Sequence, residues 1–132
     1  MALKRELRLR KSREFQRVRQ RGQSVSSQLL ILAWMPNELA GLRIGFVVSK
    51  RISKHAVERN HIKRLLSEAI RPVLPGISGG WDIVISARNL ASSADVYMFE
   101  QDITKLLRRA RLLTLPPDED RGRRPAFTSE GT

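Results

Sequence analysis

The sequence predicts an α+β fold, a sandwich in which helices pack on a small sheet, in the order helix, two or three strands, helix, strand, helix. Short apolar runs bounded by turn residues indicate strands, whereas other segments repeat their apolar residues every three or four positions, as helices do. The chain of 132 residues has the length of one domain, and 41% of its residues are hydrophobic, enough for a core. We expect a basic arm over residues 1–11, a single folded domain over 12–115 and a disordered tail over 116–132.

A first helix is expected to begin at Ser12, a suitable N-cap, and to end before Gly22. Glu14 lies in its first turn, where an acidic side chain is favourable. Phe15 and Val18 are three residues apart and share one side, so this side faces the core and the arginine-rich remainder faces solvent.

The remaining apolar runs predict three strands, and a brief fourth near 23–26 stays open as an alternative. Two longer strands are expected over 28–35 and 42–49, and turn residues between them indicate that they pair as a hairpin. Residues 81–87 form the third strand. Gly45 lies inside a strand, which indicates a bulge or a close approach by another backbone.

The most informative segment is a helix that is capped by Ser53 or a neighbour and ends near Val73. From Lys50 to Arg71 the sequence holds seven Lys or Arg residues against two Glu. The helical repeat places polar side chains on one stripe, namely Asn60, Arg64, Ser67 and Arg71. It places apolar side chains on the opposite stripe, namely Ile62, Leu65, Leu66, Ala69 and Val73. One side can therefore be buried while the other presents cations to nucleic acid.

A final helix is predicted after a capping box in which Ser92 is the cap and Asp95 occupies the third position. Its apolar side chains recur at spacings of three and four: Val96, Phe99, Ile103, Leu106, Leu107 and Ala110.

The aromatic side chains fall into two groups. Trp34, Phe46, Trp81 and Phe99 lie within apolar patterns and are expected in the core. Phe15 leaves two interpretations open, because it can anchor the first helix to the core or stack on an unpaired RNA base.

The charge balance narrows the class of partner. Lys and Arg number 25 and Asp and Glu 13, a formal net charge of +12, which indicates a polyanionic partner. The sequence contains no cysteine, which excludes disulfides and thiolate chemistry. It has neither an apolar run of membrane-spanning length nor a signal-peptide pattern, so we expect a cytoplasmic protein without membrane association.

No catalytic constellation is evident in the sequence. His55 and His61 lie among Lys and Arg residues that disfavour a metal cation, so no metal site is predicted. Glu58 and Glu68 are expected to pair with basic neighbours on the helix, and Asp82 to have a structural hydrogen-bonding role. We therefore expect a binding protein that does not catalyse a reaction alone.

One block of the sequence resembles the protein subunit of bacterial ribonuclease P. The matching positions are Arg43, Gly45, Ser49, Lys50, Ala56, Val57, Arg59, Asn60, Lys63, Arg64, Glu68 and Arg71. LRKSREFQRVRQRG near the start and WDIVISAR at 81–88 match as well, so the resemblance covers residues 5–112.

The resemblance implies the protein subunit of a ribonucleoprotein endonuclease that removes the 5′ leader from precursor tRNA. The RNA subunit is catalytic and holds the Mg²⁺ that activates water, so no catalytic or metal-binding residue is assigned to the protein. The protein would grip the catalytic RNA and the single-stranded leader, raise substrate affinity and support Mg²⁺ binding, with one protein per RNA in a bacterial cytoplasm. The resemblance also implies the full order αβββαβα, a sandwich in which a small four-stranded sheet packs with helices. It further implies a left-handed βαβ crossover around the basic helix, although right-handed connections are the default.

The resemblance assigns roles to particular residues. Contacts with the RNA subunit fall to Lys50, Arg51, Lys54, Arg59, Asn60, Lys63, Arg64 and Arg71. The leader-binding cleft falls to Phe15, Arg19 and Ala33. Arg19 and Ala33 stand where the family often has aromatic residues, so Arg19 would supply a guanidinium contact in place of stacking. His61 and Ser67 stand where arginine is usual.

Two other hypotheses stay open. A stand-alone RNA-binding or ribosomal protein on a similar fold would also explain the charge and the basic helix. A DNA-binding regulator is disfavoured, because no helix-turn-helix spacing is evident and the basic helix follows a strand.

Overall fold

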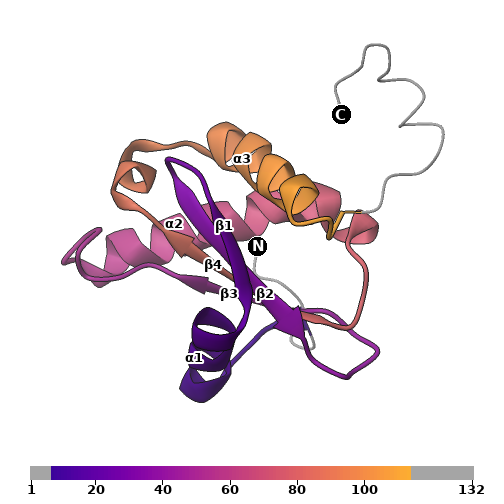
Figure 1. Ribbon diagram of the computed structural model, residues 1–132. Helices are drawn as coiled ribbons and strands as arrows, with labels where there is room; N and C mark the ends of the chain where they lie inside the picture. Colours follow the sequence, from indigo (N-terminus) through magenta and orange to yellow (C-terminus); the bar gives the residue numbers. More distant parts are fainter. Residues whose placement is uncertain (1–6, 114–132) are drawn as a thin grey trace, which may run out of the picture.

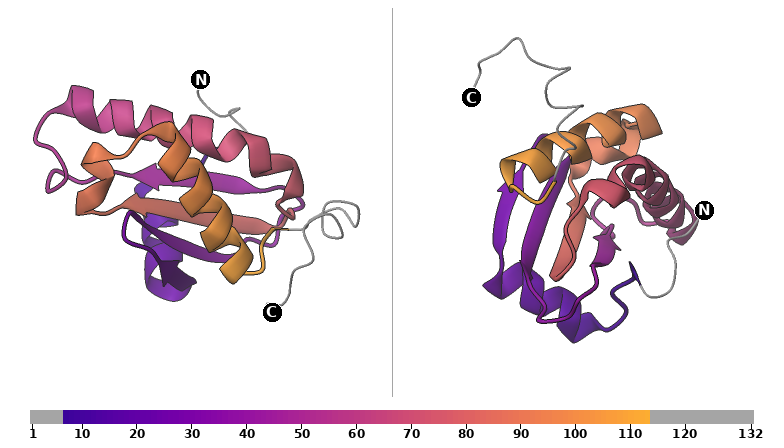
Figure 2. Two further views of the ribbon diagram at one scale, coloured as in Figure 1. Left: turned by 90° about the horizontal axis from the view of Figure 1, so that it is seen from above. Right: turned by 90° about the vertical axis from the view of Figure 1, so that its right-hand side faces the viewer.

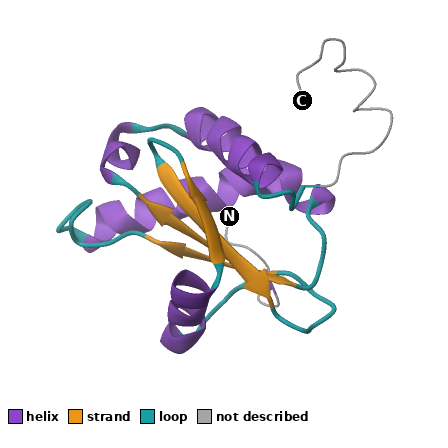
Figure 3. Ribbon diagram, in the orientation of Figure 1, coloured by secondary structure: helices purple, strands orange, loops and turns teal. Residues whose placement is uncertain are grey.

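The computed structural model describes residues 7–113, which form a four-stranded sheet and three α-helices (Figures 1 and 3). In chain order the elements are α1 (Ser12–Arg21), β1 (Gln23–Ser26), β2 (Leu30–Pro36), β3 (Arg43–Val47), α2 (Ala56–Ile70), β4 (Trp81–Ala87) and α3 (Val96–Arg109). The 3₁₀ helices η2 (Arg71–Gly76) and η3 (Asn89–Ser93) follow α2 and β4. The predicted order αβββαβα is confirmed; the tail predicted over 116–132 lies outside the described residues.

The strand pairing differs from the expected hairpin. β2 pairs with β1 and β4, both antiparallel, and β3 pairs with β4 in parallel, so the sheet order is β1-β2-β4-β3. The prediction that residues 28–35 and 42–49 pair directly was wrong. β4 lies between these two strands because Ile83, Val84 and Ile85 are fully buried, and a strand that is apolar on both faces favours the centre of the sheet.

Helices cover the two faces of the sheet unequally. α2 and α3 lie together over one face, where they bury the larger core around Leu32, Ile83 and Phe99 (Figure 2). α1 alone lies over the other face, where Val18 packs against Ala33 in a smaller cluster. Because α1 is one short helix that crosses the strands at one end, part of this second face stays open.

α2 connects the parallel strands β3 and β4, so β3, α2 and β4 form the βαβ unit that the resemblance implies. The predicted apolar stripe of α2 is confirmed, since Ile62, Leu66 and Ala69 are buried and Leu65 and Val73 pack against the same core. This connection brings the first turn of α2 to the end of the sheet where β3 finishes (Figure 1).

The helix ends differ from the predicted caps. Lys11 rather than Ser12 occupies the N-cap of α1, and the carboxylate of Glu14 accepts the Lys11 N–H at 3.2 Å. Asp95 rather than Ser92 is the N-cap of α3, because its side chain accepts the Met98 N–H at 2.9 Å. The N-cap is the residue that directly precedes the first helical residue. The sequence pattern does not fix this boundary to within one or two residues.

α2 is shorter than predicted. It begins after His55, whose N–H donates to the Ser53 hydroxyl at 3.2 Å, so Ser53 acts one turn before the helix rather than as its cap. It ends at Ile70, after which Pro72 and the following residues adopt the tighter 3₁₀ geometry of η2.

Residues 8–10 precede α1 and lie beside β3, where Arg8 forms a bridge with Ile44. Residues 1–6 of the predicted basic arm lie outside the described residues. The Leu9 N–H donates to the Ile44 carbonyl at 3.0 Å, and the Leu9 side chain is buried. This segment therefore runs along the outer edge of β3 and occupies hydrogen-bonding groups that an edge strand would otherwise expose. Within residues 7–113 no helix is long and apolar enough to cross a membrane.

Candidate nucleic-acid interface

The first half of α2 and the loop before it carry an exposed group of cations. The loop contributes Lys50, Arg51 and Lys54, and the helix contributes Lys63 and Arg64, all of them exposed. Asn60 and Arg71 are exposed as well, so these residues lie where the sequence placed the polar side of the helix. A row of cations on a rigid helix can bind phosphates with little loss of backbone freedom.

Ser67 does not belong to this exposed row. Its exposed fraction is 8%, and the neighbouring Ala69 and Ile70 are fully buried. The prediction that Ser67 shares a solvent-facing stripe with Arg64 and Arg71 was wrong, because the core covers the second half of α2 more widely than the first. The surface available to a polyanion is therefore concentrated at the start of α2.

Arg59 has a different role from its neighbours. Its guanidinium donates to the carbonyls of Ser53 and Lys54 at 3.0 and 2.9 Å, and the side chain is half-buried. The same loop is fixed by the hydroxyl of Ser53, which donates to the carboxylate of Glu58. Arg59 therefore holds the loop that carries Lys54, besides adding its own charge to the surface.

The two histidines lie among these cations. Nδ1 of His61 and Nη2 of Arg64 are 3.3 Å apart on the exposed side of α2. Among the described residues no group of three or more His, Asp and Glu side chains lies close enough together to hold a metal ion.

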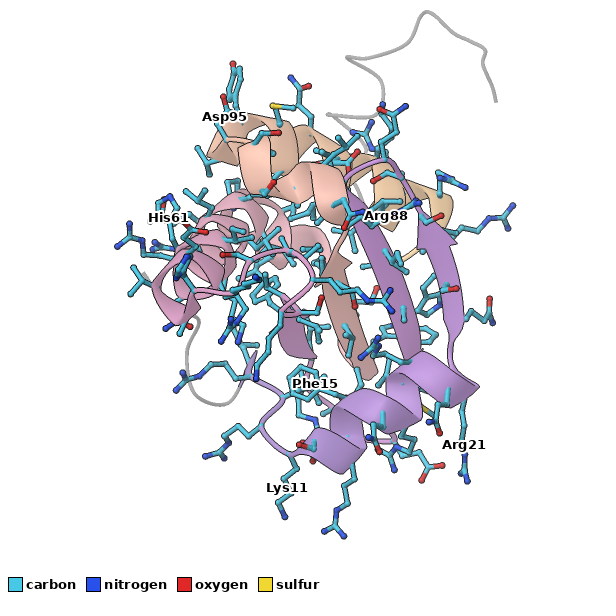
Figure 4. The ribbon with its side chains drawn as sticks, turned by 90° about the vertical axis from the view of Figure 1, so that its left-hand side faces the viewer. Lys11, Phe15, Arg21, His61, Arg88 and Asp95 are labelled. Carbon is cyan, nitrogen blue, oxygen red and sulfur yellow. The ribbon has the colours of Figure 1, made fainter. Side chains whose placement is uncertain are left out.

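Phe15 lies on the open face of the sheet. It projects from α1 toward the strands, whereas Lys11 and Arg21 at the two ends of α1 point away (Figure 4). The ring packs against the smaller cluster of Leu9, Val18, Ala33 and Val84, yet it is only partly buried. It is therefore an anchor of α1 that keeps some exposed surface, so both interpretations of the residue are compatible with its position.

The other two predicted cleft residues lie in different environments. Arg19 is exposed one turn after Phe15 on α1. Ala33 is only 5% exposed and packs with Val18 and Val84 beneath α1, which leaves it little surface for contact with RNA.

Arg88 borders the open face on the side opposite α1 (Figure 4). Its backbone N–H donates to the Leu29 carbonyl at 2.8 Å, and its guanidinium donates to the Ser27 carbonyl at 2.6 Å. Arg88 thus ties the β1–β2 turn to the end of β4 while it remains exposed.

A buried ionic network fixes α1 on the sheet. Asp82 is fully buried and accepts two hydrogen bonds from Arg43, at 2.9 Å from Nε and 2.8 Å from Nη2. The remaining Nη1 of Arg43 donates to Glu14 on α1 at 3.0 Å, and Asn37 donates to Asp82 at 3.0 Å. The structural role predicted for Asp82 is confirmed, but its partners could not be read from the sequence, because they are far apart in the chain.

The network changes the acidity of its members. Burial opposes ionisation of Glu14, but hydrogen bonds from the N–H groups of Lys11 and Arg10 and the charge of Arg43 outweigh it, so the pKa of Glu14 is lowered. The hydrogen bonds to Asp82 are the largest cause that raises the pKa of Arg43. Both shifts mean that the network favours the charged form of the side chain, the carboxylate of Glu14 and the guanidinium of Arg43.

The fold and these surfaces define an α+β protein that presents cations to a polyanion and an aromatic ring on an open sheet face. A comparison with protein families matches residues 3–111 to the family described as Ribonuclease P. The ribonuclease P protein component of Chloroflexus aurantiacus is 42% identical over 118 residues, which cover 89% of this chain and 87% of the relative. That of Caldanaerobacter subterraneus is 38% identical over 104 residues, covering 79% and 89%.

Solved structures agree with this match. The RNase P protein of Staphylococcus aureus superimposes with a TM-score of 0.74 at 28% identity, covering 82% of this chain and 98% of that one. The protein from Thermotoga maritima gives a TM-score of 0.69 at 28% identity, covering 77% and 96%. The chain belongs to the ribonuclease P protein family, the accessory protein subunit of an endoribonuclease that processes tRNA.

Asp82→Asn should lower the free energy of unfolding by about 3 kcal/mol, near the low end for breaking a buried ion pair, because Arg43 retains some access to water. Urea unfolding of the purified protein measures this loss. Arg17→Ala is the matched control: Nη2 of Arg17 is 3.7 Å from the same carboxylate but its side chain is 45% exposed, so the loss should stay below about 1 kcal/mol. Equal losses in the two variants would contradict the network.

Glu14 should make stability depend on pH in the acidic range. Its folded pKa lies below the ordinary value of 4.5, so its contribution is complete above 4.5 and is lost as the pH falls through the lower folded pKa. Thermal unfolding of the wild type and Glu14→Gln, followed from neutrality to below pH 4.5, checks this. The gap between the two melting temperatures should be largest near neutrality and should shrink in acid; a constant gap would contradict the shift.

Proposed function

We propose that this protein binds the catalytic RNA of ribonuclease P through the start of α2 and the single-stranded 5′ leader of precursor tRNA through the open face beside Phe15. The observation that carries the proposal is that one folded domain presents two different surfaces, one at the start of α2 and one on the sheet beside Phe15. One is cationic and suits a folded polyanion; the other offers an aromatic ring and a guanidinium, which suit unpaired bases.

Charge density supports the assignment of α2 to the RNA subunit. The cations of this surface are exposed, and the acidic residue within its first turn, Glu58, is engaged by the hydroxyl of Ser53. Each phosphate that such a side chain neutralises releases condensed counterions, so the surface supplies affinity without reading a base sequence.

The open face of the sheet supports the assignment of the leader. A single strand can lie against a sheet and stack its bases on an aromatic side chain, whereas a duplex hides its bases within the helix. Arg19 lies on the exposed side of α1 near Phe15 and can contact either a base or a phosphate. We propose that Phe15 and Arg19 contact the leader. Ala33 is buried beneath α1 and helps to pack this helix on the sheet, without touching the leader itself.

The proposal assigns hydrolysis to the RNA subunit. The described residues contain no group of three or more carboxylates or histidines that would suit a metal held by the protein itself. We therefore propose that Mg²⁺ is bound by the RNA and that the protein favours Mg²⁺ binding indirectly: its cations offset the repulsion between phosphates and so stabilise the folded RNA that forms the Mg²⁺ sites. One protein per RNA is the proposed composition.

Reconstitution of the holoenzyme tests the function directly. Adding the purified protein to ribonuclease P RNA at low Mg²⁺ should stimulate removal of the leader from precursor tRNA. Sequencing of RNA that copurifies with the protein separates this function from that of a ribosomal protein, because ribosomal RNA would be recovered in the latter case. Failure to stimulate cleavage would refute the proposal.

Arg64→Ala should weaken association with ribonuclease P RNA and lower its salt dependence by about one unit of slope for one lost phosphate contact. Dissociation constants measured over a range of salt concentrations give this slope. Lys105→Ala is the matched control, because Lys105 is an exposed cation on α3, outside the proposed surface. An unchanged slope for Arg64→Ala would place Arg64 outside the interface.

Phe15→Ala should lower the affinity of the holoenzyme for leader-bearing precursor tRNA by about 1–3 kcal/mol, the value of one stacked base. Binding of the same tRNA without its leader should not change, and this comparison isolates the leader. Because the ring is also partly buried, thermal unfolding of the free protein belongs to the same experiment. A loss of stability without loss of leader-dependent affinity would leave Phe15 as an anchor only.

A further inference from the structure

Gly45 lies directly beneath the ring of Phe15. A Cβ atom added at Gly45 would be 2.3 Å from Cε2 and 2.4 Å from Cζ of that ring. Both distances are far shorter than a contact between non-bonded carbon atoms, so the ring would have to move. It would also be 3.2 Å from Cβ of Leu9. The sequence indicated a bulge or a close backbone approach at this glycine; the structure instead brings a side chain from another element against it.

A second contact sets the same register between α1 and β3. Arg43 and Gly45 are two residues apart on β3 and therefore face the same side of the sheet. Glu14 and Phe15 are neighbours on α1, and Glu14 bonds to Arg43 at 3.0 Å. The ion pair thus fixes the first turn of α1 on β3, and the ring falls on the one residue of the strand that has no side chain.

We propose that Gly45 is a positioning residue for leader binding: it forms a seat that holds the ring of Phe15 in one orientation against the sheet, with the remaining surface of the ring turned to the open face. This inference rests on the proposed leader contact of Phe15 and goes beyond it, because it assigns a role to a residue that has no side chain to touch RNA.

Packing explains why a fixed ring would bind better than a mobile one. The ring lies over Gly45 and packs against the smaller cluster, so its freedom to rotate is reduced before RNA arrives. A base that stacks on it does not have to immobilise it, and the entropy cost of that step is avoided. A larger residue at position 45 would push the ring away from the sheet and remove this restriction.

Gly45→Ala is the decisive variant, because the clashing atoms belong to the far end of a side chain that can rotate away while the strand keeps its hydrogen bonds. Gly41→Ala is the matched control: a Cβ atom at this glycine meets nothing within 4 Å. Each variant is reconstituted with ribonuclease P RNA, and its affinity is measured for one labelled precursor tRNA with and without the 5′ leader. Phe15→Ala and the double variant Phe15→Ala with Gly45→Ala complete a double-mutant cycle.

Gly45→Ala should lower affinity for the leader-bearing substrate by about fivefold or more, without exceeding the loss caused by Phe15→Ala. Affinity for the leaderless tRNA should be unchanged, and Gly41→Ala should match the wild type with both substrates. In the Phe15→Ala background the ring is absent, so Gly45→Ala should cause no further loss of leader affinity; the 3.2 Å approach to Cβ of Leu9 is present in both backgrounds and can affect only the melting temperature.

Three results would overturn the inference: wild-type leader affinity in Gly45→Ala, an equal loss for leaderless tRNA, or additive losses of leader affinity in the double variant. If Gly45→Ala alone fails to fold, the double variant still decides the matter, because removing the ring should restore folding. All these results presuppose that the wild-type protein stimulates the RNA. Its failure to do so would refute the proposed function instead, so the two failures are distinguishable.

Discussion

The buried carboxylate of Asp82 is the constraint around which this end of the protein is arranged. A fully desolvated carboxylate is costly unless it is paired and hydrogen-bonded, and Arg43 meets this need with two parallel bonds while Asn37 supplies a third. The third nitrogen of the guanidinium then reaches Glu14 on α1. One buried charge therefore joins β4, β3, the β2–β3 connection and α1, and it fixes the helix that carries Phe15.

The same network decides which charges remain available for RNA. Arg43 is paired with both Asp82 and Glu14, so its charge is already balanced within the network and is not available to a phosphate. Arg59 is partly used as well, because its guanidinium holds the carbonyls of the β3–α2 loop. The cations left exposed, such as Arg64, keep their charge for phosphates. The number of arginines in the sequence therefore overstates the number of cations that are available to bind phosphates.

The sequence predicted those features that depend on local periodicity. The apolar stripe of α2, the strand character of β4 and the order of elements follow from residues that are neighbours in the chain. Features that depend on distant partners were not predictable in the same way. The hairpin expected between residues 28–35 and 42–49 failed because β4, which follows much later, lies between them. Ser67 was placed at the surface because periodicity does not reveal how widely the core covers a helix.

The candidate site shows the same division. The exposure of Asn60 and Arg64 on α2 could be predicted from residue type and spacing, whereas the burial of Ala33 could not, because it depends on the packing of α1 over β2. Gly45 carried a signal in the sequence, since a glycine inside a strand weakens it unless something approaches closely. What approaches is set by the register of α1 on β3, which the Glu14–Arg43 pair defines over a separation of 29 residues.

Anchoring and stacking are therefore compatible roles for Phe15. A ring that is entirely buried cannot meet a base, and a ring that is entirely exposed is mobile and must be ordered by its ligand. Contact with Gly45 on one side leaves the other available, so the energy that fastens α1 to the sheet also orients the ring before RNA binds. Under the proposed leader contact, one residue both anchors α1 to the sheet and meets the RNA.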